Sequence, residues 1–152
     1  MPRERGEKTV ALNRKARHDY FVEDSFEAGL VLHGTEVKSM RLGRVSLKES
    51  FCAVKDSELF AFGMHISPYE QGNIHNKDPM RPKKLLMHRS QIARLAGLAQ
   101  RQGYALIPLK IYLRDGRMKM ELGLCKGKKM HDKREDDAKR SAQRDIERSM
   151  KA

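Results

Sequence analysis

The feature that most constrains the fold is a pair of alternating apolar and polar runs in the second half of the chain. Apolar side chains recur at every second position, which is the period of a strand with one buried face. Asp115 and Gly116 separate the two runs, and Asp-Gly is a strong signal for a tight hairpin turn. We predict a long hairpin with Pro108 at an edge or a bulge. Its two apolar faces are expected to be Ile107, Leu109, Ile111 and Leu113, and Met118, Met120, Leu122 and Leu124.

Shorter β-prone segments precede this hairpin. Residues 20–22 and 30–32 are rich in aromatic and branched side chains, and residues 51–54 and 59–62 flank a polar connection at 55–58. Two helices are predicted between strands. The first lies near 35–42, with Thr35 as its N-cap; the second lies near 88–102, with Ser90 as its cap and Gly103 as its end.

About five strands and two helices therefore precede the final hairpin. No repeated strand–helix–strand units occur, so a parallel sheet is not expected. The prediction is a mainly β fold: a small, five-stranded, oligonucleotide-binding type of antiparallel β-barrel with added helices and a basic C-terminal tail. A split β-sandwich remains the alternative on pattern alone.

The charge of the chain indicates a polyanionic partner. The formal net charge is +12 over 152 residues, and the sequence pI is about 9.9. Basic charge also attracts acidic membranes, but no apolar run approaches the roughly 18 residues of a spanning helix, and no signal-peptide core is expected at the N-terminus. RNA or DNA is therefore the favoured partner class, with no membrane.

The last 27 residues, 126–152, hold ten Lys or Arg, six Asp or Glu and no aromatic residue. So little apolar surface cannot offset the roughly 1–2 kcal/mol per residue lost on ordering a backbone, so the free tail is expected to be disordered. Four apolar residues nevertheless recur every fourth position and would form one stripe of a helix. The prediction is a tail that becomes helical on a polyanion, with a stripe of Ala138, Ala142, Ile146 and Met150.

No catalytic or metal-binding constellation is found, and neither an enzyme nor a cofactor is predicted. The six histidines lack metal-ligand spacing, and no phosphate loop or nucleophile elbow occurs. Cys52 and Cys125 lie 73 positions apart without partners, so they are expected to be small buried residues in a reducing cytoplasm.

The chain divides into a basic arm at 1–17, a barrel at 18–125 and a basic tail at 126–152. Four segments combine cations with rings, amides or carboxylates that suit RNA: residues 13–20, Glu27 with 34–41, residues 81–86, and 126–134. Each also has an ordinary interpretation. The arm and tail could be solvated charged segments, residues 81–86 could be a loop entering a core strand, and Glu36 could pair with Lys38 or Arg41.

The order and spacing of several segments resemble the SsrA-binding protein family, also called small protein B, over nearly the whole length. Those segments are ALNRKARHDY at 11–20, FEAGLVLHGTEVKSMRLG at 26–43, HISPY at 65–69, RPKKLLMHR at 81–89, PLKIY at 108–112 and ELGLCKGKKMHDKR at 121–134. The departures are conservative, such as Cys125 where a small residue is common.

The resemblance implies a cytoplasmic, non-enzymatic adaptor of trans-translation. Such proteins bind the tRNA-like domain of transfer-messenger RNA and help deliver its alanyl form, with elongation factor Tu, to the A site of stalled ribosomes. The barrel is expected to occupy the place of the missing anticodon arm, and the tail to enter the decoding centre and the empty mRNA channel of the small subunit. A monomer is expected.

The resemblance also assigns residues. Contacts to transfer-messenger RNA are expected from Asn13, Arg14, Lys15, Arg17, His18, Tyr20, Glu27, Glu36, Lys38, Lys83, Lys84 and Leu86. Contacts to the decoding site and mRNA channel are expected from Lys126, Gly127, Lys128, Lys129, His131, Asp132, Lys133, Arg134, Ile146 and Met150. Without the resemblance, a general single-strand or ribosome-associated RNA chaperone remains the main alternative; a nuclease or membrane association through the tail would be exposed by cleavage or vesicle-binding assays.

Overall fold

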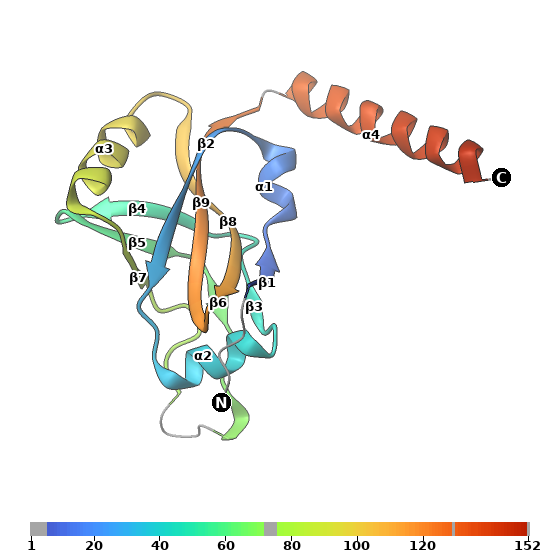
Figure 1. Cartoon of the computed structure of the whole chain (residues 1–152). Coiled ribbons are helices and arrows are strands. Elements are labelled where there is room, and N and C mark those ends of the chain that lie inside the picture. The colour runs from blue at the N-terminus through green and yellow to red at the C-terminus, as the bar shows by residue number, and fades with distance from the viewer. Residues whose placement is uncertain (1–5, 72–75, 129, 152) are drawn as a thin grey trace.

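The computed structural model describes residues 6–71, 76–128 and 130–151 (Figure 1). Its strands are β1 (Glu7–Leu12), β2 (Tyr20–Leu30), β3 (Val45–Ser46), β4 (Phe51–Lys55), β5 (Glu58–Phe62), β6 (His65–Ile66), β7 (Lys83–Leu86), β8 (Tyr104–Arg114) and β9 (Arg117–Gly127). Its helices are α1 (Arg14–Asp19), α2 (Gly34–Arg41), α3 (Arg89–Ala99) and α4 (Met130–Lys151). None of the described helices is long and apolar enough to cross a membrane.

The strands form a closed antiparallel barrel, which confirms the predicted fold class. The sheet runs β1-β8-β4-β5-β7-β2-β9, and β9 pairs again with β8, so six strands from β8 to β9 complete a ring. β1 lies outside this ring on the edge of β8 that also meets β4. Seven strands precede the β8–β9 hairpin, so the expected count of about five was too low. Residues 7–12 and 83–86 form strands that were not expected, and 45–46 and 65–66 form a small second sheet, whereas the run at 20–22 and Leu30 belong to one strand, β2.

Both predicted hairpin turns are present. Asp115 and Gly116 connect β8 to β9 with φ of 50° and 79°, the left-handed pair that a tight two-residue turn requires. Asp56 and Ser57 make the corresponding turn between β4 and β5, with φ of 52° and 63°. The Asp-Gly signal thus predicted the longer hairpin correctly, and the polar connection predicted the shorter one.

A bulge in β8 changes which of its residues share a face. The register with β9 shifts between Pro108 and Lys110, so Pro108 lies at a bulge as predicted. Ile111 pairs inward with the main core, whereas Ile107 and Leu109 pack in a second cluster beneath α1. The expectation that all four apolar residues of this run share one face was wrong, because a one-residue shift moves side chains to the opposite face.

On β9 the alternation holds without interruption, and its four apolar residues all lie in the main core: Met118, Met120, Leu122 and Leu124. Both cysteines are free and buried, as expected; burial raises the pKa of the Cys125 thiol to about 11. Buried Ile92 and Leu95 attach α3 to this core.

The two predicted helices exist, with different caps. α2 begins after His33 rather than Thr35, because the Glu36 carboxylate accepts a hydrogen bond from the His33 backbone N–H at 2.9 Å. α3 begins after His88 and ends at Ala99, four residues before Gly103.

The N-terminal region is more structured than the predicted arm at 1–17. β1 pairs with β8 from Glu7↔Arg114 to Leu12↔Lys110, and α1 follows at once. Asn13 ends the strand and caps the helix, since its Oδ1 accepts a hydrogen bond from the Ala16 N–H at 3.2 Å. Residues 7–19 are therefore part of the body of the protein, and residues 1–5 lie outside the described residues.

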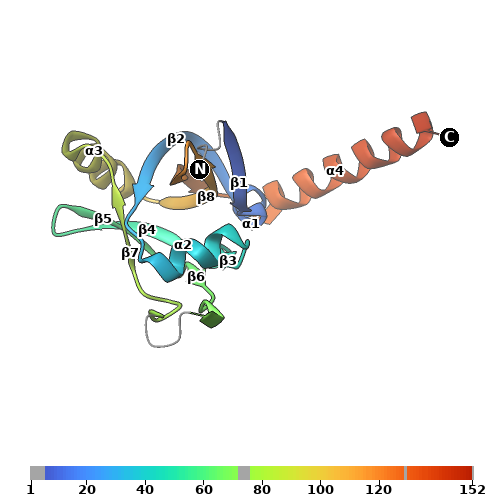
Figure 2. The ribbon, with the colours of Figure 1, turned by 60° about the horizontal axis from the view of Figure 1, so that its bottom comes forward.

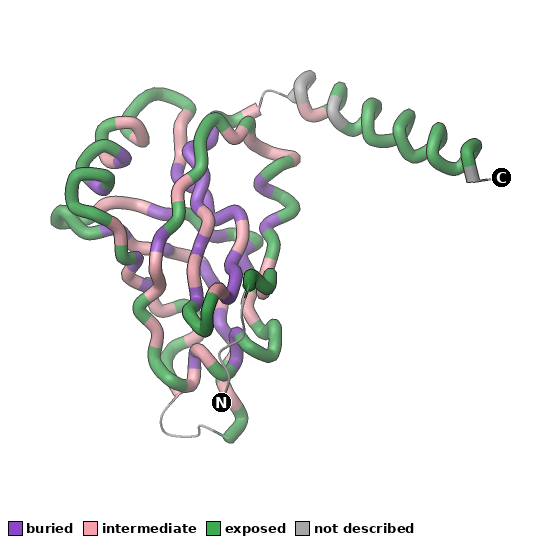
Figure 3. The backbone as a smooth tube through the Cα atoms, viewed as in Figure 1, coloured by how far each residue is buried: buried purple, intermediate pink, exposed green. Residues whose placement is uncertain are grey.

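The tail is described as one helix that projects away from the barrel in both views (Figures 1 and 2). β9 continues to Gly127, so the body extends two residues into the range predicted as tail. Beyond residue 137 the described part of α4 is exposed along its length (Figure 3), with Ile146 at 54% and Met150 at 80%. α4 contains the four residues of the predicted stripe. That the tail is disordered when free and becomes helical on a polyanion stays a prediction.

Gly63, which follows β5, should be intolerant of a side chain. Its φ is +70°, and a Cβ there would lie 2.5 Å from the Glu49 carbonyl oxygen. We expect Gly63→Ala to lower the free energy of unfolding by about 3 kcal/mol, from left-handed strain of roughly 1–2 kcal/mol plus overpacking. Gly43→Ala is the matched control, because Gly43 has φ +74° but open space around its Cβ position. Equal losses in urea unfolding would contradict the role of the close contact.

Candidate nucleic-acid interface

Glu27 is held in place by two donors on the outer surface of the barrel. It lies on β2, and its Oε2 accepts hydrogen bonds from the Tyr112 hydroxyl at 2.5 Å and from Arg114 Nη1 at 2.6 Å. The other arm of the Arg114 guanidinium donates to Glu7 on β1 at 3.0 Å. Residues of three strands, β1, β2 and β8, thus fix one carboxylate, whose second oxygen accepts no hydrogen bond from any described residue.

This setting keeps Glu27 ionised. The Tyr112 hydrogen bond lowers the pKa of the Glu27 carboxyl, and the charges of Arg114 and Lys119 lower it further, against a smaller opposing effect of burial. Burial and the bond to Glu27 raise the pKa of Tyr112, so its hydroxyl remains a donor. An ionised carboxylate with a free oxygen can accept from a base amino group or a ribose hydroxyl.

Glu27 lies on the rim of a groove of about 350 Å³ between β2, β7, β9 and the start of α3. Leu86 also lines it, with 55% of its surface exposed. Glu27 and Leu86, both predicted as RNA contacts, are 59 positions apart in the sequence, and the structure brings them to one groove. It adds neighbours that the sequence did not single out, among them Lys119, His88 and Gln91.

Three other predicted contacts are buried inside the protein. Lys83 is fully buried, and its Nζ donates to the carbonyl oxygens of Met64 at 2.7 Å and Pro79 at 2.9 Å. The prediction that Lys83 contacts phosphate was wrong, because its ammonium group has no exposed surface. Lys84, the next residue, is half-buried and pairs with Glu58 at 3.1 Å, so it remains a candidate.

Glu36 and Asn13 are buried as well. Glu36 is 4% exposed and pairs with Arg81, not with either cation that the sequence offered as its partner. Asn13 is 6% exposed, and its Nδ2 donates to the carbonyl oxygens of Leu47 and Pro108. Their side chains hold α2 and α1 in place rather than facing a ligand. Lys38, by contrast, is exposed on α2, with its Nζ 5.4 Å from the centre of the Tyr69 ring.

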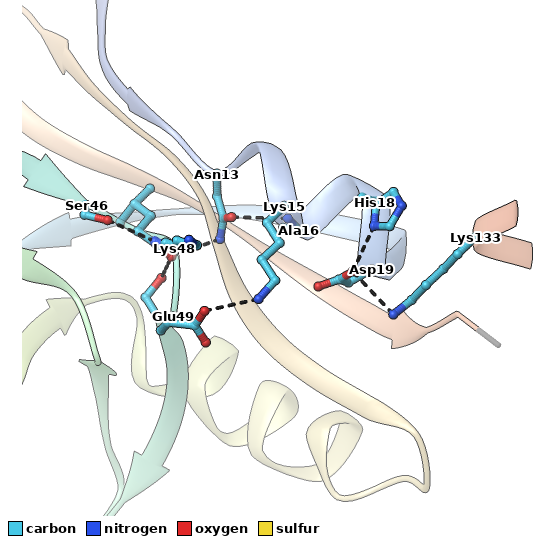
Figure 4. A network of polar contacts seen from close by, with 11 residues as sticks. Asn13, Lys15, Ala16, His18, Asp19, Ser46, Lys48, Glu49 and Lys133 are labelled. Carbon is cyan, nitrogen blue, oxygen red and sulfur yellow. Dashed lines mark hydrogen bonds and ion pairs between the residues drawn. The ribbon is translucent and has the colours of Figure 1, made fainter. Parts of the chain in front are cut away.

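α1 presents cations beside a second, larger groove. Arg14, Lys15 and Arg17 are all exposed, and Lys15 pairs with Glu49 at 3.1 Å (Figure 4). The groove holds about 650 Å³ between α1, β4, α3 and β8, and its lining includes Lys15, Lys48 and the rings of Tyr20, Phe51 and Tyr104. Cations with rings can bind the phosphates and the bases of unpaired RNA.

The base of the tail meets α1 at Asp19. The Asp19 carboxylate lies 3.0 Å from His18 Nδ1 and 3.4 Å from Lys133 Nζ (Figure 4). Lys128 reaches the same corner, where its backbone N–H donates to the Asp19 carbonyl at 2.9 Å and its Nζ to the Arg17 carbonyl at 3.0 Å. His18 and Lys133 thus contact the same carboxylate. The sequence assigned His18 to transfer-messenger RNA and Lys133 to the ribosome.

The remaining tail residues fall into three groups. Lys126 and Gly127 are exposed at the end of β9, paired with Phe21 and Tyr20. Arg134, Ile146 and Met150 are exposed on α4. Lys129 lies outside the described residues, as do the side chains of His131 and Asp132. Among the described residues, no cluster of His, Cys, Asp and Glu could hold a metal ion.

Comparison of the sequence with known proteins identifies the family of this chain. The family model described as "SmpB protein" matches residues 10–152, which includes both the barrel and the tail. The chain belongs to the SmpB family. It is 60% identical to the SsrA-binding protein of Acetivibrio thermocellus over 144 residues, covering 95% of this chain and 94% of that protein. It is 57% identical to the SsrA-binding protein of Geobacillus thermodenitrificans over 151 residues, covering 99% and 97%.

A solved structure supports the same conclusion. A chain described as "tmRNA-SmpB: a journey to the center of the bacterial ribosome" matches with a TM-score of 0.68 and 46% identity, over 81% of this chain and 87% of that chain. The resemblance seen in the sequence segments and the barrel fold that it implies are therefore confirmed. The individual contacts assigned to RNA stay predictions.

Lys83 should make stability depend on pH. Burial lowers the pKa of its ammonium group from 10.5 to about 8. The unfolded chain therefore binds the proton more tightly, and folding should become more favourable as pH rises from about 8 toward 10.5. Lys83→Met leaves the carbonyls of Met64 and Pro79 unpaired and removes the pH-dependent increase in stability. The difference in unfolding free energy between the parent protein and the variant should therefore grow from about pH 8 to 10.5. Lys84→Met is the control, and a deficit that is flat between pH 7 and 10 would contradict the assignment.

Proposed function

We propose that this protein is a non-enzymatic RNA-binding adaptor of trans-translation. It binds the tRNA-like domain of transfer-messenger RNA and helps deliver it to the A site of stalled ribosomes. The observation that carries this proposal is the 46% identical match to a chain described with tmRNA and the bacterial ribosome, which covers 81% of the chain. The net charge of +12 and the ionised Glu27 beside an open groove are consistent with an RNA partner.

The barrel holds the RNA through exposed groups that differ in task. Arg14, Lys15, Arg17, Lys38 and Lys84 supply positive charge, which positions phosphates without reading sequence. Glu27 and Lys119 supply an acceptor and a donor in the smaller groove, with Leu86 as an exposed apolar wall. This combination suits a folded RNA elbow, where unpaired bases project from a compact phosphate surface.

The tail serves the ribosome. Residues 126–134 reach the decoding centre of the small subunit, and the stripe with Ile146 and Met150 lies in the mRNA channel when no message fills it. The support is the exposure of α4 beyond residue 137 and its direction away from the barrel (Figure 2). A message in the channel would exclude the helix sterically, so the tail folds there only where message is absent.

The remaining partners follow from this role. Elongation factor Tu contacts the complex through alanyl transfer-messenger RNA, and the protein acts as a monomer in the cytoplasm, where ribosomes work. A monomer suits a molecule that replaces one arm of a single tRNA-like RNA.

Glu27→Gln tests the RNA site. The change removes the charge but keeps the shape, and we expect affinity for a transcript of the tRNA-like domain to fall about tenfold, within the roughly 1–3 kcal/mol of a good base contact. Glu23→Gln is the matched control, because Glu23 lies on the same strand and accepts a hydrogen bond from the Tyr104 hydroxyl at 2.9 Å. Filter binding measures both variants.

Two results would count against the proposal. Equal loss in the two variants would remove the special role of Glu27. Equal affinity of the parent protein for the tRNA-like transcript and for an unrelated stem-loop of the same length would favour a general RNA chaperone.

Removal of residues 138–152 tests the tail. This cut leaves β9 and the contacts at Asp19 intact, so binding to the tRNA-like transcript should be unchanged. Rescue of ribosomes stalled on a message without a stop codon should fall to background in a purified translation system. Ile146→Asp should lose most rescue, whereas Ser141→Asp, off the apolar stripe, should lose little. Full rescue by the truncated protein would contradict the tail's role.

A further inference from the structure

Three contacts join the end of α1 to Lys128 and to the first two turns of α4. Lys133 Nζ lies 3.4 Å from the Asp19 carboxylate, and His18 Nε2 lies 3.2 Å from the Asp137 carboxylate. The third is the pair of hydrogen bonds from Lys128 to the backbone of α1, which satisfies carbonyl groups at the end of that helix. Residues 17–19 of α1 therefore meet Lys128, Lys133 and Asp137 at one junction, which we call the tail clasp.

We propose that His18 and Asp19 are positioning residues, and that this tail clasp sets the direction in which the tail leaves the barrel. The inference goes beyond the proposed function because it assigns His18 to the tail rather than to RNA, and it stands on contacts within this chain alone. It also divides the tail into a docked part up to residue 137 and a free part that carries the apolar stripe.

The chemistry of His18 makes the clasp depend on charge. Its Nδ1 faces Asp19 at 3.0 Å and its Nε2 faces Asp137 at 3.2 Å. Ionised carboxylates only accept hydrogen bonds, and a neutral imidazole has a single N–H to donate. Both contacts can therefore be hydrogen bonds only when the ring is protonated, so the protonated ring bridges the two helices.

The surrounding charges support the protonated form. The bonds to Asp19 and Asp137 raise the pKa of His18 above its ordinary value of 6.5, against a smaller effect of burial. A raised pKa means that the His18 bridge of the clasp is complete below pH 6.5 and is lost as pH rises through the higher folded value. The charged groups of the junction are Lys15, Arg17, His18 and Asp19 on α1, Lys128 before α4, and Lys133 and Asp137 on α4.

The clasp is strong enough to orient the tail and weak enough to open. His18 is 34% exposed, Asp19 23% and Asp137 59%, and ion pairs this exposed are individually weak because solvent screens them. Phosphate groups of a bound RNA compete for the same cations, so RNA at α1 releases the first turns of α4. The direction of the tail is thereby coupled to occupancy of the barrel.

Asp137→Asn in the full-length protein tests the clasp, with Asp145→Asn, two turns further along the exposed helix, as the matched control. The first readout is the titration of the His18 imidazole by NMR, assigned with His18→Gln. We expect the His18 midpoint to be lower in Asp137→Asn than in the parent protein and unchanged in Asp145→Asn. A midpoint that is identical in all three proteins would overturn the proposal.

The second readout is the direction of the tail. Spin labels at Ser57→Cys and Ser141→Cys report the distance between the barrel and α4, since the native cysteines are buried. The distance distribution should be narrow at pH 6, broader at pH 8.5, and broad at both pH values in Asp137→Asn. A distance distribution that is the same at both pH values and in both proteins would overturn the proposal. Neither readout uses RNA, so the clasp and the proposed function fail independently.

Discussion

The whole architecture depends on the ability of β8 to pair on both of its edges. One edge takes β9 along its full length, and the other takes β4 near Leu106 and β1 from Lys110 onward. The bulge between Pro108 and Lys110 separates these two regions and lets the strand bend from one partner to the next. The pairing with β4 closes the ring, and the pairing with β9, which lies between β8 and β2, brings Tyr112 and Arg114 within reach of Glu27.

The same bulge shows what sequence could and could not predict. Alternation and the Asp-Gly turn were enough to predict β8, β9 and their connection, because a tight turn fixes register locally. Ile107 and Leu109 continue the alternation of Ile111, so nothing in the pattern indicates that they lie in another cluster. Only the partners of β8, which come from distant segments, decide that point. β1 was missed for a similar reason, since its three polar residues precede its three apolar ones without alternation and the strand is defined by its pairing.

The sequence likewise could not tell which residues of the candidate site are exposed and which are buried. Lys83 and Lys84 look equivalent as a basic pair, but successive residues of a strand face opposite sides. Leu85 is core, and Lys83 pairs inward with Ala61 while Lys84 pairs with outward-facing Phe60. The alternation in a four-residue strand is too short to be recognised beforehand. Glu27 and Glu36 are similarly alike in sequence; one is exposed because its strand faces solvent, and the other is buried because it closes a helix start.

The barrel is stabilised by an apolar core, whereas the tail has almost no apolar surface to bury, and the two parts are joined at Asp19. The barrel is held by a continuous apolar core, whose loss is costly at every position. The free part of α4 has only a thin stripe, half of it alanine, so it gains little by packing on its own protein and remains available to a surface of phosphate and base. A tail of this kind would point in every direction if it were tethered by backbone alone. A few solvent-exposed charges at its base restrict that freedom at little energetic cost, and they do so with groups that an RNA phosphate can replace.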